Sequence, residues 1–214
     1  MENKIEDTQY WKNRKPDDPR LDWRINEKNK TWIEEYSYSQ WHPHRQLIIK
    51  ELNNLWPFQG LLEVGCASAP NLMEIERYFH TTSLTGIDVN AHAIKEAEQN
   101  IPDGTFLEGD VRQIPFLDKS FDIVLADAIL MYLNQLEIGK ALDEMRRVAR
   151  KGIIIIDWFD KDPNGVIKDF HWARNYDYLL TNMGFKMRPK YKLTQQDWPS
   201  DNWIRNGYMF IGMK

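Results

Sequence analysis

The sequence has a single cysteine, Cys66, in 214 residues. An internal disulfide is therefore impossible, which excludes the disulfide-stabilised secreted domains. Long apolar runs are also missing, because a run such as Ile153–Ile156 is far shorter than the roughly 20 residues that cross a bilayer. The charged first residues are not followed by the apolar stretch of a signal peptide. We therefore expect a cytoplasmic protein without a membrane segment.

An excess of basic residues is absent as well. Lys and Arg number 28 against 32 Asp and Glu, which gives a net charge of -4. Proteins that bind nucleic acids usually carry a basic field, since neutralised phosphates supply much of their affinity. Nucleic acid is therefore an unlikely partner, and a small-molecule substrate is favoured. One local exception is an alternating basic run in a predicted edge strand, which suits an RNA contact but equally the protection of a sheet edge; it comprises Lys186, Arg188, Lys190 and Lys192.

From Leu61 onward, predicted strands alternate with predicted helices. Five segments have strand character, and short turns or helical patterns separate them. They are 61–64, 83–88, 105–107, 121–126 and 153–156. Asn90 is predicted to cap one helix, Asn134 and Glu137 to begin another, and Gly152 to end it. This alternation indicates an α/β fold, a doubly wound and mostly parallel sheet with helices on both faces.

The two ends of the chain differ from this repeat. Residues 1–56 are predicted to form an N-terminal arm and helical cap, in which a helix follows Pro43. Residues 57–214 form the α/β domain within the same structural unit. Near the C-terminus, the strand candidates 185–193 and 207–213 follow each other with no helix predicted between them, so we expect them to be antiparallel. Pro189 places the first of these strands at a sheet edge.

Three residues at strand ends suggest a ligand site. Gly65 follows the first strand, Asp88 ends the second, and Asp110 follows the third. The carboxyl ends of parallel strands meet at one crevice, and Asp88 stands at about the 20-residue offset at which an acid reaches ribose hydroxyls. Each residue alone is an ordinary turn residue. Together they predict a nucleotide-like ligand.

These segments resemble the class I S-adenosylmethionine-dependent methyltransferases. The resemblance rests on Leu61–Cys66 with Asn71 and Leu72, and on segments 84–90, 108–110 and 121–125. It implies a seven-stranded sheet with a reversed last strand, an enzyme that transfers a methyl group to O, N or C of a small molecule, and S-adenosyl-L-methionine as cofactor. It also implies the residues that hold this cofactor, namely Glu63, Gly65, Cys66, Ala67, Ser68, Asp88, Val89, Asp110, Val111, Ala126 and Asp127.

Departures from the family pattern define the alternatives. Ala67 and Ala69 stand where the family has glycine, so a non-catalytic S-adenosylmethionine-binding module is one alternative. An RNA methyltransferase is another, although the Asn/Asp-Pro-Pro-aromatic motif of amino-methylating enzymes is absent after the fourth strand. An NAD(P)-dependent oxidoreductase is more distant, because Pro70 occupies the place of a small residue in the dinucleotide fingerprint.

Residues that act on the substrate are less well defined by the sequence. All nine tryptophans lie outside 57–157, and six aromatic residues of the flanks and of the segment after the fourth strand are predicted to wall a substrate pocket or to pack the cap. They are Trp32, Tyr38, Trp41, Tyr132, Trp158 and Trp172. Asp127 and His171 are the candidate catalytic residues. His42 and His44 are interpreted as structural, and no metal is predicted because no third ligand is nearby.

Overall fold

The computed structural model describes residues 8–15, 33, 39–80, 82–169 and 171–214. Its centre is a sheet in the order β3-β2-β1-β4-β5-β10-β8, with β9 also paired to β10. The strands are β1 (Gly60–Val64), β2 (Ser83–Asp88), β3 (Thr105–Glu108), β4 (Phe121–Asp127), β5 (Ala149–Trp158), β8 (Lys186–Met187), β9 (Tyr191–Lys192) and β10 (Gly207–Met213). Strands β1 to β5 pair in parallel, as predicted.

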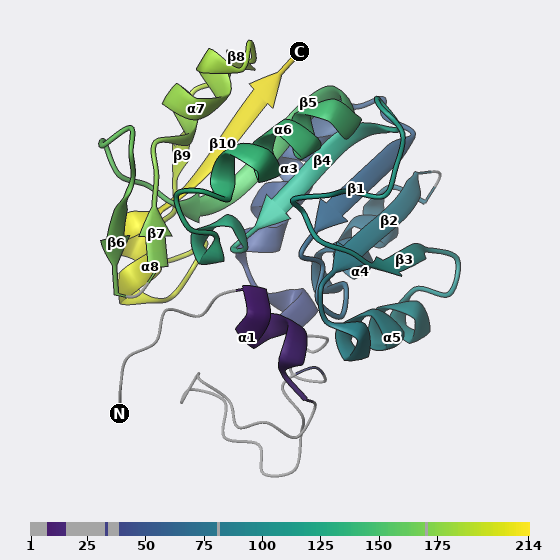
Figure 1. The fold of residues 1–214 in the computed structure, drawn as a ribbon. Coiled ribbons are helices and arrows are strands. Elements are labelled where there is room, and N and C mark those ends of the chain that lie inside the picture. The colour runs from purple at the N-terminus through teal and green to yellow at the C-terminus, as the bar shows by residue number, and fades with distance from the viewer. Residues whose placement is uncertain (1–7, 16–32, 34–38, 81, 170) are drawn as a thin grey trace.

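The strand order reverses between β1 and β4. The chain proceeds outward from β1 through β2 to β3 and then returns to place β4 on the other side of β1. In open α/β sheets, ligands bind outside the carboxyl ends of the strands at such a switch point. Figure 1 shows that these ends face α1 (Thr8–Asn13), which lies below the sheet in that view.

Helices cover both faces of the sheet (Figure 1). On one face α3 (His44–Leu55), α4 (Pro70–Tyr78) and α5 (Ala91–Asn100) share a core with Leu61 of β1 and Ile123 of β4. On the other face α6 (Ile138–Val148) and α7 (Tyr176–Asn182) share a core with Leu62 and Val124. Successive strand residues thus enter opposite cores, which is why the strands are nearly continuous apolar runs. The predicted doubly wound fold is confirmed.

The C-terminal part is more broken than predicted. The reversed strand β10 is confirmed, since it runs antiparallel to β5, β8 and β9. The predicted strand 185–193 is instead two short strands, β8 and β9, on the same edge of β10. Pro189 lies between them and cannot donate to a ladder. The prediction of one edge strand that carries the alternating basic residues is therefore wrong. The prediction that no helix lies between the last two strands is wrong as well, because α8 (Asp201–Asn206) precedes β10.

Gly152 does not end a helix. Helix α6 ends at Val148, and Gly152 lies inside β5, paired with Met213 of β10. A Cβ atom on Gly152 would lie 2.8 Å from the Met213 sulfur and 2.9 Å from the Gly212 carbonyl oxygen. Glycine is thus explained by the close approach of two strands rather than by helix termination.

The predicted helix starts differ in outcome. Asn90 caps α5, since its Oδ1 accepts from the amides of His92 (3.0 Å) and Ala93 (3.1 Å). Asn134 and Glu137 contact each other, because the backbone amide of Asn134 donates to Glu137 Oε2 at 2.9 Å. They form a turn ahead of α6 rather than its first residues, because α6 begins at Ile138.

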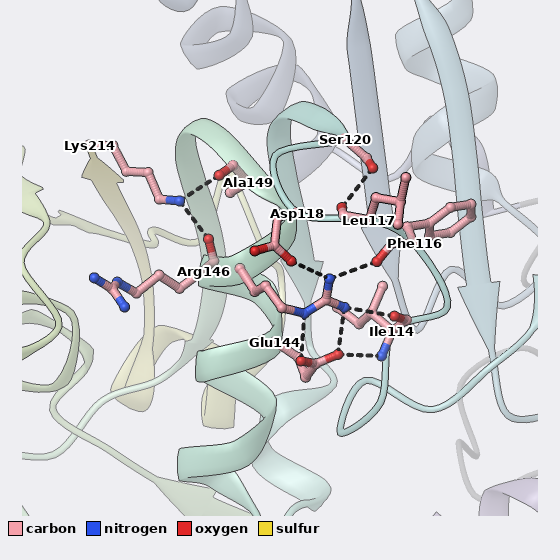
Figure 2. Close-up of polar contacts among 10 residues, drawn as sticks. Ile114, Phe116, Leu117, Asp118, Ser120, Glu144, Arg146, Ala149 and Lys214 are labelled. Carbon is pink, nitrogen blue, oxygen red and sulfur yellow. Dashed lines mark hydrogen bonds and ion pairs between the residues drawn. The ribbon is translucent and has the colours of Figure 1, made fainter.

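One arginine joins α6 to the loop before β4. The Arg147 guanidinium donates to Glu144, to Asp118 and to the carbonyl oxygens of Ile114 and Phe116 at distances of 2.7–3.0 Å. Figure 2 shows these groups converging from the loop and from the helix. The pKa of Arg147 is raised, chiefly by its hydrogen bond with Glu144. This contact fixes the loop that follows Asp110.

Additional short elements lie around the sheet. They are η1 (Ser39–Trp41), η2 (Leu130–Tyr132) and a hairpin of β6 (Val166–Lys168) and β7 (His171–Ala173). The hairpin follows β5 in the sequence. Among the described residues no helix is long and apolar enough to cross a membrane.

Candidate functional site

The loop after β1 has an unusual backbone. Gly65 has φ 69°, and the two alanines adopt the same left-handed region, with φ 47° at Ala67 and 65° at Ala69. The amides of Gly65 and Cys66 both donate to the carbonyl oxygen of Ile87, at 2.8 and 3.0 Å. A Cβ on Gly65 would lie 2.6 Å from a side-chain carbon of Ile129. The loop therefore keeps the backbone of a glycine-rich loop, although alanine occupies two positions at which the family has glycine.

Asp88 fastens this loop from the end of β2. Its carboxylate accepts from the amide of Ala67 at 2.9 Å and from the amide of Asn90 at 2.8 Å. Burial raises the pKa of Asp88, and these backbone hydrogen bonds oppose the rise. Each carboxylate oxygen can accept a second hydrogen bond, so Asp88 can shape the loop and still bind a hydroxyl.

Three polar side chains meet under the loop at the switch point. The Asn71 side-chain amide donates to Glu63 Oε1 (2.6 Å) and to Asp127 Oδ2 (2.8 Å), which joins β1, α4 and β4. Burial raises the pKa of Glu63 well above its usual value. Burial alone would also raise the pKa of Asp127, but His44, Arg45 and Asn71 together outweigh it, so the pKa is lowered. Asp127 is thus the ionised member of the group.

Some acceptor atoms of this group remain unused. Glu63 Oε2, Asn71 Oδ1 and Asp127 Oδ1 are buried and have no hydrogen-bond partner within the described part of the chain. A buried acceptor without a partner is costly. The arrangement therefore suits a ligand that brings hydrogen-bond donors, such as an ammonium group.

His44 extends the group toward α3. Its Nε2 lies 2.7 Å from Asp127 Oδ2, and its Nδ1 lies 2.5 Å from Nδ1 of His42. His44 is almost fully buried, and burial lowers its pKa despite the nearby carboxylate of Asp127. The Trp198 ring lies 4.2 Å from the His44 ring and 4.9 Å from the His42 ring. The sequence interpretation of these histidines as structural did not foresee the contact of His44 with Asp127.

Asp110 is bound by a neighbouring residue. Arg112 donates to its carboxylate through Nε, at 2.9 and 3.0 Å, and through the backbone amide at 2.8 Å. Burial acts to raise the pKa of Asp110, but the hydrogen bonds and charge of Arg112 lower it overall. Its predicted contact with the cofactor remains a prediction.

The other predicted cofactor residues line the same edge of the sheet. Ala126 is buried in β4, Val111 is buried after Asp110, and Val89 is half-buried after Asp88. Ser68 is buried and donates to the carbonyl oxygen of Ile33 at 3.2 Å. Cys66 is buried too, and burial raises the pKa of its thiol well above the usual value, so it is a packing residue rather than a nucleophile.

Four predicted pocket or catalytic residues follow β4 and β5. The Tyr132 ring lies 5.2 Å from the rings of Trp11 and His171, and His171 lies 5.0 Å from Trp158. Trp172 contacts the guanidinium of the buried Arg174 at 4.9 Å. Burial lowers the pKa of His171, whose Nδ1 lies 2.8 Å from the Asp169 carbonyl oxygen. The structure brings Tyr132, Trp158 and His171 together, with Trp11 at their side.

The remaining pocket residues are not part of this cluster. Trp41 is 63% exposed and covers the guanidinium of Arg77 at 4.3 Å. Trp41 thus packs on a side chain of α4 and is otherwise exposed to solvent. Trp32 and Tyr38 lie outside the described residues. Trp198 and Trp203, which stack at 3.8 Å beside His44, were not predicted near the site, and no sequence spacing would have revealed them, because they come from the far C-terminal segment.

Comparison with known proteins agrees with this geometry. The family described as "Methyltransferase domain" matches residues 61–152. The chain is 32% identical over 130 residues to phthiotriol/phenolphthiotriol dimycocerosates methyltransferase 1 of Mycobacterium ulcerans, covering 59% of this chain and 45% of that protein. It is 33% identical over 94 residues to a fatty-acid O-methyltransferase of Mycolicibacterium smegmatis, covering 43% and 34%. The chain thus spans less than half the length of these relatives.

A solved structure shows the same fold over most of the chain. Magnesium protoporphyrin IX methyltransferase of Synechocystis, solved with bound S-adenosylmethionine, superimposes with a TM-score of 0.64 at 12% identity, covering 90% of this chain and 86% of that one. The chain therefore has the fold of that enzyme. Residues 61–152 match a methyltransferase-domain family, which agrees with the family resemblance seen in the sequence.

Proposed function

We propose that the protein is an S-adenosylmethionine-dependent methyltransferase acting on a small molecule. The observation that carries this proposal is the convergence of Glu63, Asp88 and Asp127 on the carboxyl edge of β1, β2 and β4, around a loop held in a glycine-like backbone. Similar proteins whose names state a substrate include methyltransferases of phthiotriol dimycocerosates, of a fatty acid, of demethylmenaquinone and of magnesium protoporphyrin IX. They support a small-molecule acceptor.

The residues present fit the cofactor. The buried acceptors Glu63 Oε2 and Asp127 Oδ1 suit the ammonium group of its methionine part. Residues 65–68 would hold the rest of that part, and Asp88 would accept from the ribose hydroxyls. When bound, the cofactor supplies an electrophilic methyl group on a sulfonium.

The chain's own contribution is then positioning and the exclusion of water. A methyl transfer needs an acceptor atom in line with the carbon–sulfur bond, and holding it there removes much of the barrier. The aromatic cluster of Tyr132, Trp158 and His171 would bind the acceptor beside Asp127. We place this activity in the cytoplasm, consistent with the single cysteine.

Titration calorimetry with S-adenosylmethionine and S-adenosylhomocysteine tests the proposal. We expect both to bind, and Asp88→Ala to weaken binding at least tenfold, because it loses the ribose contact and releases the amide of Ala67. Asp103→Ala, at an exposed position, is the matched control and should bind like the wild type. If neither ligand binds, the proposal fails.

The described residues carry no observation that favours the alternatives. The positive φ of Ala67 and Ala69 removes the reason to expect a loop that cannot approach the cofactor. The basic edge residues make internal contacts, since Lys190 pairs with Asp177 at 2.5 Å and Lys192 donates to the Arg205 carbonyl oxygen at 2.9 Å. A binding module without catalysis would bind S-adenosylhomocysteine but transfer no labelled methyl group to any metabolite fraction. An RNA enzyme would show a steep salt dependence of RNA binding.

A further inference from the structure

A histidine of the β6–β7 hairpin lies among the aromatic residues that we assign to the acceptor. The His171 ring lies 5.2 Å from the Tyr132 ring and 5.0 Å from the Trp158 ring. Side chains alternate along a strand, so His171 shares a face of β7 with Ala173, which is fully buried in one cluster with Trp158. The backbone amide of Arg174, after β7, donates to the Trp158 carbonyl oxygen at 2.9 Å. The half-buried imidazole is therefore turned toward the carboxyl end of β5.

Tyr132 links this histidine to the cofactor region. Tyr132 ends η2, and Ile129, just before η2, is the side chain that a Cβ on Gly65 would overlap. The segment 129–132 thus packs on the loop after β1 at one end and on His171 at the other. Figure 1 shows the hairpin and α1 on the side of the sheet to which β4 points. His171 is therefore one short segment away from the loop assigned to the cofactor.

A backbone carbonyl group fixes the proton of this imidazole. Nδ1 of His171 lies 2.8 Å from the carbonyl oxygen of Asp169. A carbonyl oxygen can only accept, so Nδ1 carries a proton and donates it. Burial lowers the pKa of His171, although the hydrogen bond and the charge of Asp169 oppose the change, so the ring is neutral at pH 7. Nε2 is then the unprotonated, basic nitrogen, and it has no hydrogen-bond partner among the residues that the structure describes.

The neighbouring indole adds an unused donor. Trp158 is 3% exposed, and its Nε1 is buried without an acceptor in the described part of the chain. A buried donor without an acceptor is costly. Nε1 of Trp158 can only donate and Nε2 of the neutral His171 can only accept, so the cluster offers one atom of each kind. A hydroxyl group both donates and accepts and matches this pair, whereas an ionised carboxylate only accepts.

Asp127, the other residue that the sequence indicates for catalysis, is already engaged. Its Oδ2 lies 2.7 Å from Nε2 of His44 and accepts from the side-chain amide of Asn71 at 2.8 Å. Its pKa is lowered, which makes it a weak base at neutral pH. Its buried Oδ1 suits the ammonium group of the cofactor. Of the two residues, His171 is the one with an unused basic atom.

We propose that His171 is a catalytic base that takes the proton of a hydroxyl acceptor through Nε2, with the apolar body of the acceptor against the rings of Tyr132 and Trp158. This inference rests on the proposed methyltransferase function. It deepens that function by naming the acceptor class. A hydroxyl group carries a proton that must leave on methylation, whereas a carboxylate at neutral pH carries none and needs no base.

The transfer balances in atoms and charge. The hydroxyl oxygen forms a bond to the methyl carbon, the carbon–sulfur bond breaks, and its electron pair stays on sulfur. The hydroxyl proton passes to Nε2 of His171. The positive charge lost at sulfur is thus gained by the imidazole, where the carbonyl oxygen and the carboxylate of Asp169 stabilise it.

Two matched pairs of probes test the acceptor class. 4-Octylphenol is paired with 4-octylbenzoate, and 1-octanol with octanoate, so that each pair shares its apolar body and differs in the group that would take the methyl. We expect labelled methyl transfer to at least one hydroxyl probe and to neither carboxylate. Transfer to the carboxylates alone, or to none of the four probes, would contradict the proposal.

Long-range ¹H–¹⁵N NMR of the full chain without ligand tests the proton position directly. At pH 7 we expect His171 to be neutral and protonated at Nδ1, with an unprotonated Nε2. With S-adenosylhomocysteine present, 4-octylphenol should shift the Nε2 signal of His171, because the hydroxyl group donates to it. A His171 that is protonated at Nε2, or at both nitrogens, would overturn the inference whatever acceptor the enzyme takes.

His171→Asn tests the base itself. Asparagine can keep a side-chain N–H for the carbonyl oxygen of Asp169 but has no basic atom in place of Nε2. The variant should lower kcat for the hydroxyl probe by about 10²–10⁴-fold, while S-adenosylhomocysteine binds as it does to the wild type. His80→Gln, at an exposed position, is the matched control for both rate and binding. A His171→Asn enzyme that keeps the wild-type rate would overturn the catalytic role.

The failure of this inference is separable from failure of the proposed function. If the wild type binds S-adenosylhomocysteine but His171 is protonated at Nε2, only the inference fails. The same holds if the wild type methylates the carboxylate probes alone. If the wild type binds neither S-adenosylmethionine nor S-adenosylhomocysteine, the methyltransferase proposal itself fails.

Discussion

At the scale of single residues, the loop after β1 departs from the family pattern without losing its backbone. Ala67 and Ala69 have positive φ, which costs an L-residue about 1–2 kcal/mol. Ala69 is fully buried in the core shared by α3 and α4, whereas Ala67 is half-buried. Removing the methyl group would therefore cost buried contacts at Ala69 but few at Ala67.

This difference leads to different expectations for glycine at the two positions. Ala67→Gly should raise the free energy of unfolding by up to about 1 kcal/mol, because it relieves the positive φ. Ala69→Gly should be close to neutral, since the same relief is offset by the loss of a buried methyl group. Urea unfolding at pH 7 measures both. The control is Gly65→Ala, which should destabilise by more than 2 kcal/mol because its Cβ would overlap Ile129; an equal gain in both glycine variants would contradict the argument.

Asp157, at the end of β5, is a buried acid that the proposed chemistry does not use. Its Oδ2 accepts from the Tyr176 hydroxyl at 3.2 Å and its Oδ1 from the Trp158 amide at 2.7 Å. Burial raises its pKa to about 7, although Arg174 and these hydrogen bonds oppose the rise. Between the unfolded value near 3.9 and the folded value, the native state binds the extra proton, so stability falls as pH rises through this window.

Asp157→Asn removes that dependence. Relative to the wild type, the variant should gain about 2 kcal/mol of unfolding free energy between pH 5 and pH 8, because it has no proton to lose. Urea unfolding at the two pH values measures the change. Asp103→Asn, exposed to solvent, should show the same difference from wild type at both. A pH-independent effect of Asp157→Asn would mean that Asp157 is ionised throughout this range.

At the scale of elements, Arg147 shows how one side chain holds a loop that no strand pairs with. It reaches from α6 to the carbonyl oxygens of Ile114 and Phe116 and keeps Glu144 in place to accept from the Ile114 amide at 2.8 Å (Figure 2). Arg147→Lys should lower the free energy of unfolding by about 1–3 kcal/mol, because an ammonium group cannot reproduce this planar set of donors. Arg146→Lys, one residue earlier and exposed, should change it by less than about 0.5 kcal/mol. Equal effects in urea unfolding would contradict this role.

The elements also show what the sequence could and could not predict. Strands β1, β2, β4 and β5 were predictable, because residues buried on both faces form short, nearly continuous apolar runs. The capped start of α5 was predictable from Asn90 alone. The division of the last edge into β8 and β9 was not, since it depends on where Pro189 falls against β10.

The same distinction holds for the site. Gly65 and Asp88 were predictable because they occupy strand ends, and strand ends converge in a parallel sheet. The contact of His44 with Asp127 joins residues 83 positions apart in the sequence, and only the packing of α3 on the sheet brings them together. A pattern within one segment carries no information about such a pair.

At the scale of the whole molecule, the first helix lies across the strand ends that form the site. The side-chain amide of Asn90, after β2, donates to the carbonyl oxygens of Trp11 and Arg14, both at 2.8 Å. Lys12 pairs with Glu108 of β3 at 3.9 Å, and Trp11 contacts Tyr132 after β4. Helix α1 thus spans three strand ends, as its place in Figure 1 shows, and covers the region assigned to the cofactor.

From this position we expect the opening of α1 to depend on whether the cofactor is bound. Asn90→Ser keeps an N-cap for α5 but loses both donors to α1, so α1 should open more often and trypsin should cleave after Lys12 and Arg14 about tenfold faster. If α1 closes over the bound cofactor, S-adenosylhomocysteine should slow that cleavage in the wild type, and Asn90→Ser should bind it more weakly by linkage. Asn54→Ser, on the exposed side of α3, should change neither quantity. Faster cleavage with unchanged affinity would show that α1 packs beside the site without covering it.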